Sequence, residues 1–174
     1  VAVSAAVTGL AANTVYHFRI DASNSAGTSY GLDASFTTLA DSPTVTTGSA
    51  TTIGGTSATL NGSVNPNGVT ATAWFEYGTT TSYGSSTATQ SLAAGSTAVA
   101  VSAAVTGLAA NTVYHFRIDA TNSAGTSLGT DASYTTLAAV PTVTTGSATS
   151  ITSSGATLNG SVNPNGVTTT AWFE

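Results

Sequence analysis

The sequence repeats itself at a displacement of 98 positions, and this repeat limits the possible folds more than any other feature. The stretch VAVSAAVTGLAANTVYHFRIDA at residues 1–22 returns unchanged at residues 99–120. Residues 1–76 align with residues 99–174 without a gap, and 12 of the 76 aligned positions differ. A period of this length is typical of a whole domain rather than of one solenoid turn, so we expect consecutive similar domains.

Within one period, apolar and polar residues alternate and turn residues separate the alternating stretches, which is typical of half-buried antiparallel strands. No stretch indicates a helix. The pattern predicts seven strands, A, B, C, C′, E, F and G, at residues 43–53, 57–64, 70–78, 86–92, 97–105, 112–122 and 128–137. The run Asn65-Pro66-Asn67-Gly68 predicts a turn between B and C, and residues 122–125 predict one between F and G.

The strand order predicts one complete unit flanked by two partial ones. Residues 1–40 supply strands E, F and G of one unit, residues 41–138 form a complete unit, and residues 139–174 supply strands A, B and C of another. Two arrangements would complete the partial units. Either the chain is a window on a longer repeat polymer, or the A-B-C half of one molecule docks on the E-F-G half of the next. Both arrangements predict a fibre.

The stretch LAANTVY at residues 108–114, followed by FRIDATNSAG, resembles the E-to-F corner and the F strand of fibronectin type III domains, especially those of bacterial surface and secreted proteins. The resemblance implies an all-β chain of tandem seven-stranded antiparallel sandwiches. It implies that Tyr16 and Tyr114 are tyrosine corners, which bond back to the upstream backbone. It also implies an extracellular or cell-surface location. Two positions depart from the family pattern, because Ala110 replaces a usual proline and Leu60 replaces a usual tryptophan.

Charged residues make up only 5% of the chain, against about 25% in typical soluble domains. The chain has no lysine, and its two arginines, Arg19 and Arg117, face seven acidic residues for a net charge of −5. Nucleic acid is therefore not an expected partner, because binding a polyanion requires clustered cations. The absence of cysteine excludes disulfides and thiolate metal sites. No apolar run is long enough to predict a membrane span in this sequence.

The period of two assigns side chains on strands C and F to the inner or the outer face of their sheet. The residues expected to face inward are Ala73, Phe75, Tyr77, Tyr114, Phe116, Ile118 and Ala120. The residues expected to share the outer face form the candidate interaction surface: Trp74, Glu76, His115, Arg117 and Asp119. A structural interpretation has Arg117 lying over Trp74 and pairing with Glu76, at about 0.5–1 kcal/mol per contact. A functional interpretation makes Trp74 a platform for a sugar ring or an anchor for a neighbouring protein.

No combination of residues predicts catalysis. His115 and Asp119 have no Ser or Cys nucleophile placed beside them by a motif, and no metal-binding or phosphate-binding motif occurs. The sequence thus predicts a protein that is not an enzyme and needs no cofactor. Its expected function is that of a structural component of an extracellular fibre or stalk, which assembles end to end with itself. The alternative is an adhesin, or a carbohydrate-binding or spacer module, whose Trp74 and Trp172 contact a glycan.

Overall fold

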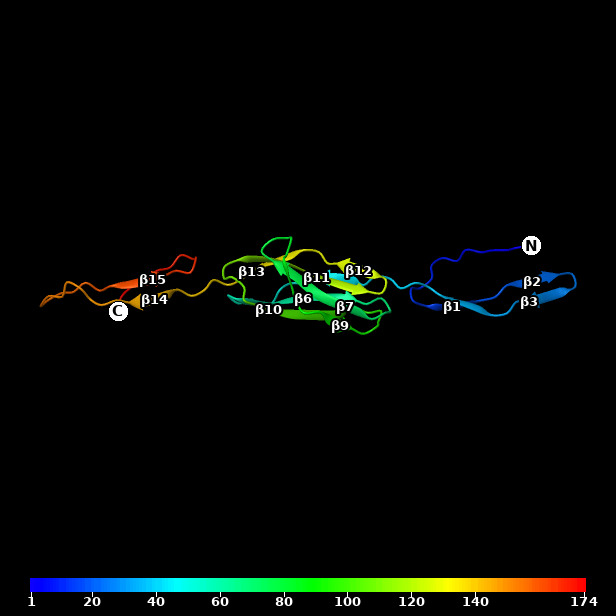
Figure 1. Cartoon of the computed structure of the whole chain (residues 1–174), viewed down its shortest axis with the longest axis horizontal. Helices are drawn as coiled ribbons and strands as arrows, with labels where there is room; N and C mark the ends of the chain where they lie inside the picture. Colours follow the sequence, from blue (N-terminus) through cyan, green and yellow to red (C-terminus); the bar gives the residue numbers. More distant parts are fainter.

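The computed structural model describes all 174 residues and contains only strands, turns and loops. Three groups of strands lie one after another along an elongated molecule, with the two chain ends in the two outer groups (Figure 1). We refer to residues 1–40 as the N-terminal segment, to residues 41–138 as the central unit and to residues 139–174 as the C-terminal segment. No helix that could span a membrane is present.

The central unit consists of two antiparallel sheets. The first has the order β10-β6-β5, with β5 at Thr44–Thr47, β6 at Ser57–Asn65 and β10 at Val99–Thr106. The second is built around β7 (Ala71–Gly78) and β11 (Val113–Asn122), which pair along their length. Its outer strands are β8 (Ser85–Ser86) and β9 (Gln90–Leu92) beside β7, and β12 (Gly125–Leu128) and β13 (Ala132–Thr135) beside β11.

The two sheets enclose one hydrophobic core. Fully buried side chains come from both, including Leu60 and Val64 of the first sheet and Phe75, Phe116 and Ile118 of the second. These residues alternate with more exposed ones along their strands, as a period of two requires. The predicted all-β sandwich is therefore confirmed.

The sheets approach closely at one glycine. A Cβ atom placed on Gly62 would lie 2.9 Å from Cδ1 of Ile118 on the facing sheet and 2.9 Å from the carbonyl oxygen of Thr46. A larger residue at this position would force the sheets apart, because a packed core has little spare volume.

The outer strands differ from their predicted extents. Strand A is shorter than predicted because regular pairing with β6 stops before Gly48, whose amide donates to the carbonyl oxygen of Asn61. Strand C′ is divided into β8 and β9 at Thr87, whose hydroxyl oxygen accepts the amide hydrogen of Phe75 in place of a backbone carbonyl. Strand G is also divided, and its first part begins at Gly125, directly after the turn, rather than at Leu128.

The phenol of Tyr114 accepts a hydrogen bond of 3.0 Å from the backbone amide of Ala109, five residues upstream. Tyr16 makes the same contact with the amide of Ala11 at 2.9 Å.

We expect Tyr114→Phe to lower the free energy of unfolding of the central unit by about 1–2 kcal/mol, because it removes the acceptor of a partly buried amide. Urea denaturation followed by circular dichroism tests this, with Tyr16→Phe as the matched control. Equal losses in the two variants would contradict it.

The two outer segments contain some of the strand pairs that the repeat forms in the central unit and lack others. In the N-terminal segment, β1 (Val15–Phe18) pairs with β4 (Ala34–Thr37), and β2 (Asp21–Asn24) pairs with β3 (Gly27–Tyr30). In the C-terminal segment, β14 (Thr142–Thr145) pairs with β15 (Gly160–Asn163). Residues 1–8 and 169–174 are unpaired, although their counterparts in the central unit lie in β10 and β7.

Candidate functional site

Polar side chains on the outer face of the second sheet form a closed network around Arg117. Nη2 of Arg117 lies 2.8 Å from Oε2 of Glu76 on the neighbouring strand β7. Nε of Arg117 lies 3.0 Å from Oδ1 of Asp119 and donates its hydrogen to Oδ2 of the same carboxylate at 3.2 Å. The guanidinium carbon of Arg117 lies 4.9 Å from the centre of the Tyr83 ring. One cation is thus held by two carboxylates and one aromatic face.

Asp119 is nearly inaccessible to solvent although its strand position points outward. Its side chain is 1% exposed, and Oδ1 has no hydrogen-bond donor. Burial raises the pKa of Asp119 above its ordinary value, and the charge of Arg117 partly offsets this effect. The ion pair therefore compensates a carboxylate that the fold has removed from water.

A second pair extends the network towards the end of the sheet. Nδ1 of His115 lies 2.8 Å from Oδ2 of Asp131, and the hydroxyl of Tyr83 donates to Oδ1 of Asp131 at 3.1 Å. Burial raises the pKa of Tyr83, and the hydrogen bond to Asp131 adds to this effect. Tyr83 connects the Arg117 cluster to the His115–Asp131 pair, because its ring contacts Arg117 and its hydroxyl contacts Asp131.

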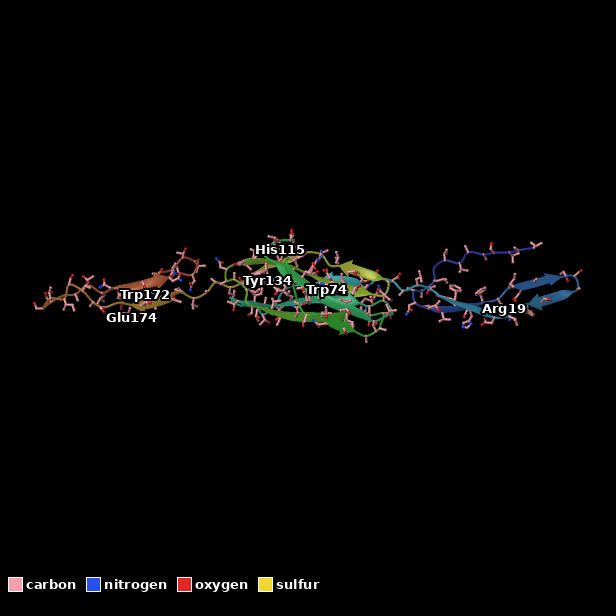
Figure 2. The ribbon with its side chains drawn as sticks, in the orientation of Figure 1. Arg19, Trp74, His115, Tyr134, Trp172 and Glu174 are labelled. Carbon is pink, nitrogen blue, oxygen red and sulfur yellow. The ribbon has the colours of Figure 1, made fainter.

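The structure brings four of the five predicted surface residues into this network and leaves Trp74 outside it. Trp74 is half-buried and lies directly across the strand pair from Asp119. The predicted stacking of Arg117 on Trp74 is wrong, because the aromatic ring over the guanidinium belongs to Tyr83. Figure 2 shows Trp74 and His115 in the central unit. As an interaction surface, this set of residues stays a prediction.

The contribution of Tyr83 was missed because it depends on a loop that folds over the sheet. Tyr83 has a φ of 56°, a conformation that a bulky residue rarely adopts. The loop passes over Gly78, where a Cβ atom would collide with the backbone of Tyr83. The two Tyr-Gly pairs at residues 77–78 and 83–84 are the only sequence signal of this arrangement.

Tyr134 presents its hydroxyl to the core without a hydrogen-bond partner. Burial raises the pKa of Tyr134 to about 12. Its counterpart in the N-terminal segment is Phe36, so the repeat itself contains the ring without the hydroxyl.

We expect Tyr134→Phe to raise the free energy of unfolding of the central unit by about 1 kcal/mol, because an unpaired buried hydroxyl is removed. A loss of stability in urea denaturation would contradict this.

The N-terminal segment exposes the face that the central unit buries. Phe18 is 56% exposed, whereas its counterpart Phe116 is fully buried. The aromatic packing is nevertheless already formed, because the ring centres of Tyr16 and Phe36 lie 5.8 Å apart, against 5.9 Å for Tyr114 and Tyr134. This aromatic packing is therefore the same in both copies, although Phe18 beside it is exposed.

The C-terminal segment also exposes apolar residues whose counterparts are buried in the central unit. It contains a groove of about 530 Å³ lined in part by Val143, Val162, Trp172 and Phe173. Phe173 is 56% exposed and folds back over Gly160, whose Cβ position lies 3.5 Å from its ring. In the central unit the corresponding glycine, Gly62, meets a side chain of the facing sheet instead. The two glycines therefore have different neighbours, although the sequence around them is the same.

Comparison with known proteins gives similarities of fold only. No protein-family model matches this sequence, and no curated protein sequence matches it. The sensor domain of the anti-sigma factor RsgI4 of Pseudobacteroides cellulosolvens is 21% identical, with a TM-score of 0.44 over 56% of this chain and 96% of that chain. The chicken CNTN1 FN1-FN3 domains are 22% identical, with a TM-score of 0.34 over 74% of this chain and 45% of that chain. The assignment to the β-sandwich class rests on the strand pairing of the chain itself.

Proposed function

We propose that this protein is a structural component of an extracellular fibre or stalk built from tandem β-sandwich domains that assemble end to end. In this proposal residues 41–138 are a complete domain, and residues 1–40 and 139–174 are halves of neighbouring domains. The observation that carries it is the exposure, at both ends of the molecule, of apolar faces whose near-identical counterparts are buried in the central unit. Each large apolar side chain left in water costs about 1.5–3 kcal/mol, so each half favours a partner.

The low surface charge supports association between units. Arg117 is paired with carboxylates within the central unit, and Arg19 lies 3.0 Å from Asp21. Lysine side chains on exposed strands commonly prevent edge-to-edge pairing. The chain has no lysine, so this protection is absent. The unpaired residues 1–8 and 169–174 therefore offer strand edges with few charges to oppose pairing.

The partner in this proposal is a further copy of the same repeat, either along one longer polypeptide or on a separate molecule. Both arrangements place one sandwich every 98 residues and give a linear assembly. The resemblance to the fibronectin type III domains of bacterial surface and secreted proteins supports an extracellular location.

Sedimentation and negative-stain electron microscopy of the 174-residue protein over a range of concentrations test the proposed function. The expected result is an average mass that grows with concentration, together with linear particles. A protein that stays monomeric up to millimolar concentration, with no linear particles, would contradict the proposal. Saturable glycan binding by such a monomer would favour the adhesin or carbohydrate-binding alternative instead.

A further inference from the structure

We propose that the N-terminal segment of one molecule and the C-terminal segment of a second copy close a composite sandwich in the register of the central unit, with Arg19 paired to Glu174 across the interface. This inference rests on the proposed function and adds the partner, the register and the residues in contact. The occupant of the exposed groove in the C-terminal segment is therefore the β1–β4 face of another copy.

The central unit supplies the register because the same residues are already paired there. Strand β11 pairs with β7 so that Arg117 faces Glu76, Ile118 faces Phe75 and Asp119 faces Trp74. Shifting each residue to its counterpart in the repeat gives three pairs for the composite sandwich: Arg19 with Glu174, Ile20 with Phe173, and Asp21 with Trp172. In the same way β10 and β6, which pair Ala100 with Ser63, predict that Ala2 lies opposite Ser161.

The polar groups of the two segments are poised for this pairing. Nε of Arg19 lies 3.0 Å from Oδ1 of Asp21, as Nε of Arg117 does from Oδ1 of Asp119. The remaining nitrogens of Arg19 make no ion pair, so they are available to a second carboxylate. Glu174 accepts a hydrogen bond of 3.0 Å from Nε1 of Trp172, which is the contact that Arg19 would replace.

One of the twelve differences between the copies lies beside the proposed contact. In the central unit, the ring that covers Arg117 is that of Tyr83. In the N-terminal segment the guanidinium of Arg19 instead lies 4.7 Å from the centre of the Tyr30 ring. The position equivalent to Tyr30 is Leu128 in the central unit. Tyr30 thus supplies, from the same segment, an aromatic face for the guanidinium of Arg19.

The apolar contact is also available. In the central unit, Ile118 fills the space over Gly62, and its counterpart Ile20 is exposed in the N-terminal segment. Near the equivalent Gly160, the closest side chain is the ring of Phe173, which is 56% exposed. Docking would let Ile20 occupy this space and let Phe173 pack beside it, as Phe75 does in the core.

A single molecule cannot make this contact within itself in its extended form. Arg19 lies in the segment at one end, whereas Trp172 and Glu174 lie at the other, with the central unit between them (Figure 2). The contact joins two different surfaces, so it is heterologous, and repeating it produces an open filament.

Paired cysteines test the register directly, because the chain has no cysteine of its own. We expect the double variant Ala2→Cys/Ser161→Cys to form intermolecular disulfides under mild oxidation, giving a ladder of dimers, trimers and longer species on non-reducing gels. The matched control is Ala6→Cys/Ser161→Cys, in which the first cysteine is displaced by four residues along the same strand. Antiparallel partners allow a disulfide only when they are nearly opposite, so the control is expected to cross-link at least tenfold more slowly. Equal rates in the two variants would overturn the inference.

Charge reversal provides a second test that leaves the central unit unchanged. Arg19→Glu is expected to weaken assembly measured by sedimentation at least tenfold, because it places two acidic residues opposite each other. The double variant Arg19→Glu/Glu174→Arg is expected to recover most of this loss. Failure of the double variant to recover would overturn the assigned pair.

The two tests separate the inference from the proposed function. Linear particles with no preference for the registered cysteine pair would leave the fibre in place and exclude the composite sandwich. Specific cross-linking that gave only closed dimers, with no longer species, would support the composite sandwich and contradict the fibre.

Discussion

Phe75→Ala is expected to lower the free energy of unfolding of the central unit by about 3–5 kcal/mol, whereas Phe173→Ala is expected to leave it unchanged. The two residues occupy equivalent positions in the sequence TAWFE, which occurs twice in the chain. Phe75 is fully buried between the two sheets, so its removal creates a cavity. Phe173 is 56% exposed and packs only against its own segment.

Urea denaturation at a protein concentration too low for assembly measures this difference. The same pair of variants then separates stability from assembly at high concentration. There Phe173→Ala is expected to reduce the sedimenting mass, because it removes an apolar side chain from the proposed interface. Leu32→Asp is a suitable control, since Leu32 is highly exposed and its counterpart in the repeat is the polar residue Thr130. If Phe75→Ala and Phe173→Ala destabilised the monomer equally, the C-terminal segment would have to be packed in a core.

Arg117→Met is expected to destabilise the central unit by about 2–3 kcal/mol at pH 7, because the carboxylate of Asp119 would stay buried without its cation. Removing one partner of a fully buried pair costs about 3–5 kcal/mol. The cost expected for Arg117→Met is smaller than this because Arg117 and Glu76 are partly solvated. Arg19→Met is the matched control. Its partner Asp21 is 42% exposed, so water replaces the lost cation and the monomer keeps its stability.

The effect of Arg117→Met is expected to depend on pH in one direction. Burial raises the pKa of Asp119 in the folded state, so its ionisation opposes folding, and stability is lost as the pH rises through the folded pKa. The charge of Arg117 lowers this pKa, so its removal raises the pKa further. The loss of unfolding free energy in Arg117→Met, relative to the unsubstituted protein, should therefore be small below about pH 4, the ordinary pKa of an aspartate. It should grow above that pH.

Denaturation curves at a series of pH values measure this dependence, and Asp119→Asn in the Arg117→Met background should restore most of the loss at pH 7. A deficit that did not vary with pH would show that Arg117 acts through its packing against Tyr83 instead.

The inner faces of the strands could be predicted because they depend on a local rule. Alternation along the chain assigned Phe75, Phe116 and Ile118 to the interior, and all three are fully buried. The same rule placed Asp119 on the outer face, yet its side chain is covered there. Strand periodicity gives the direction of a side chain but does not show what lies above it.

The features that could not be predicted depend on contacts between distant parts of the chain. Tyr83 lies 34 positions from Arg117 in the sequence, and it reaches the guanidinium only because its loop folds back over Gly78. The predicted extents of the edge strands were also wrong. The side-chain hydroxyl of Thr87 interrupts one edge strand, and another begins early, at Gly125. These contacts are set by the packed structure, and no local pattern encodes them.

By itself, the sequence determined the repeat, the alternation of each strand and the strand pairs that recur in the outer segments and in the central unit. Only the tertiary structure decided which alternating stretches become strands. Residues 1–8 and 99–106 have the same sequence, and only the second copy is a strand, because only there does β6 lie beside it. The physical reason is that the hydrogen bonds of a strand are made to another strand, so an alternating sequence supplies the two faces while a neighbour supplies the pairing.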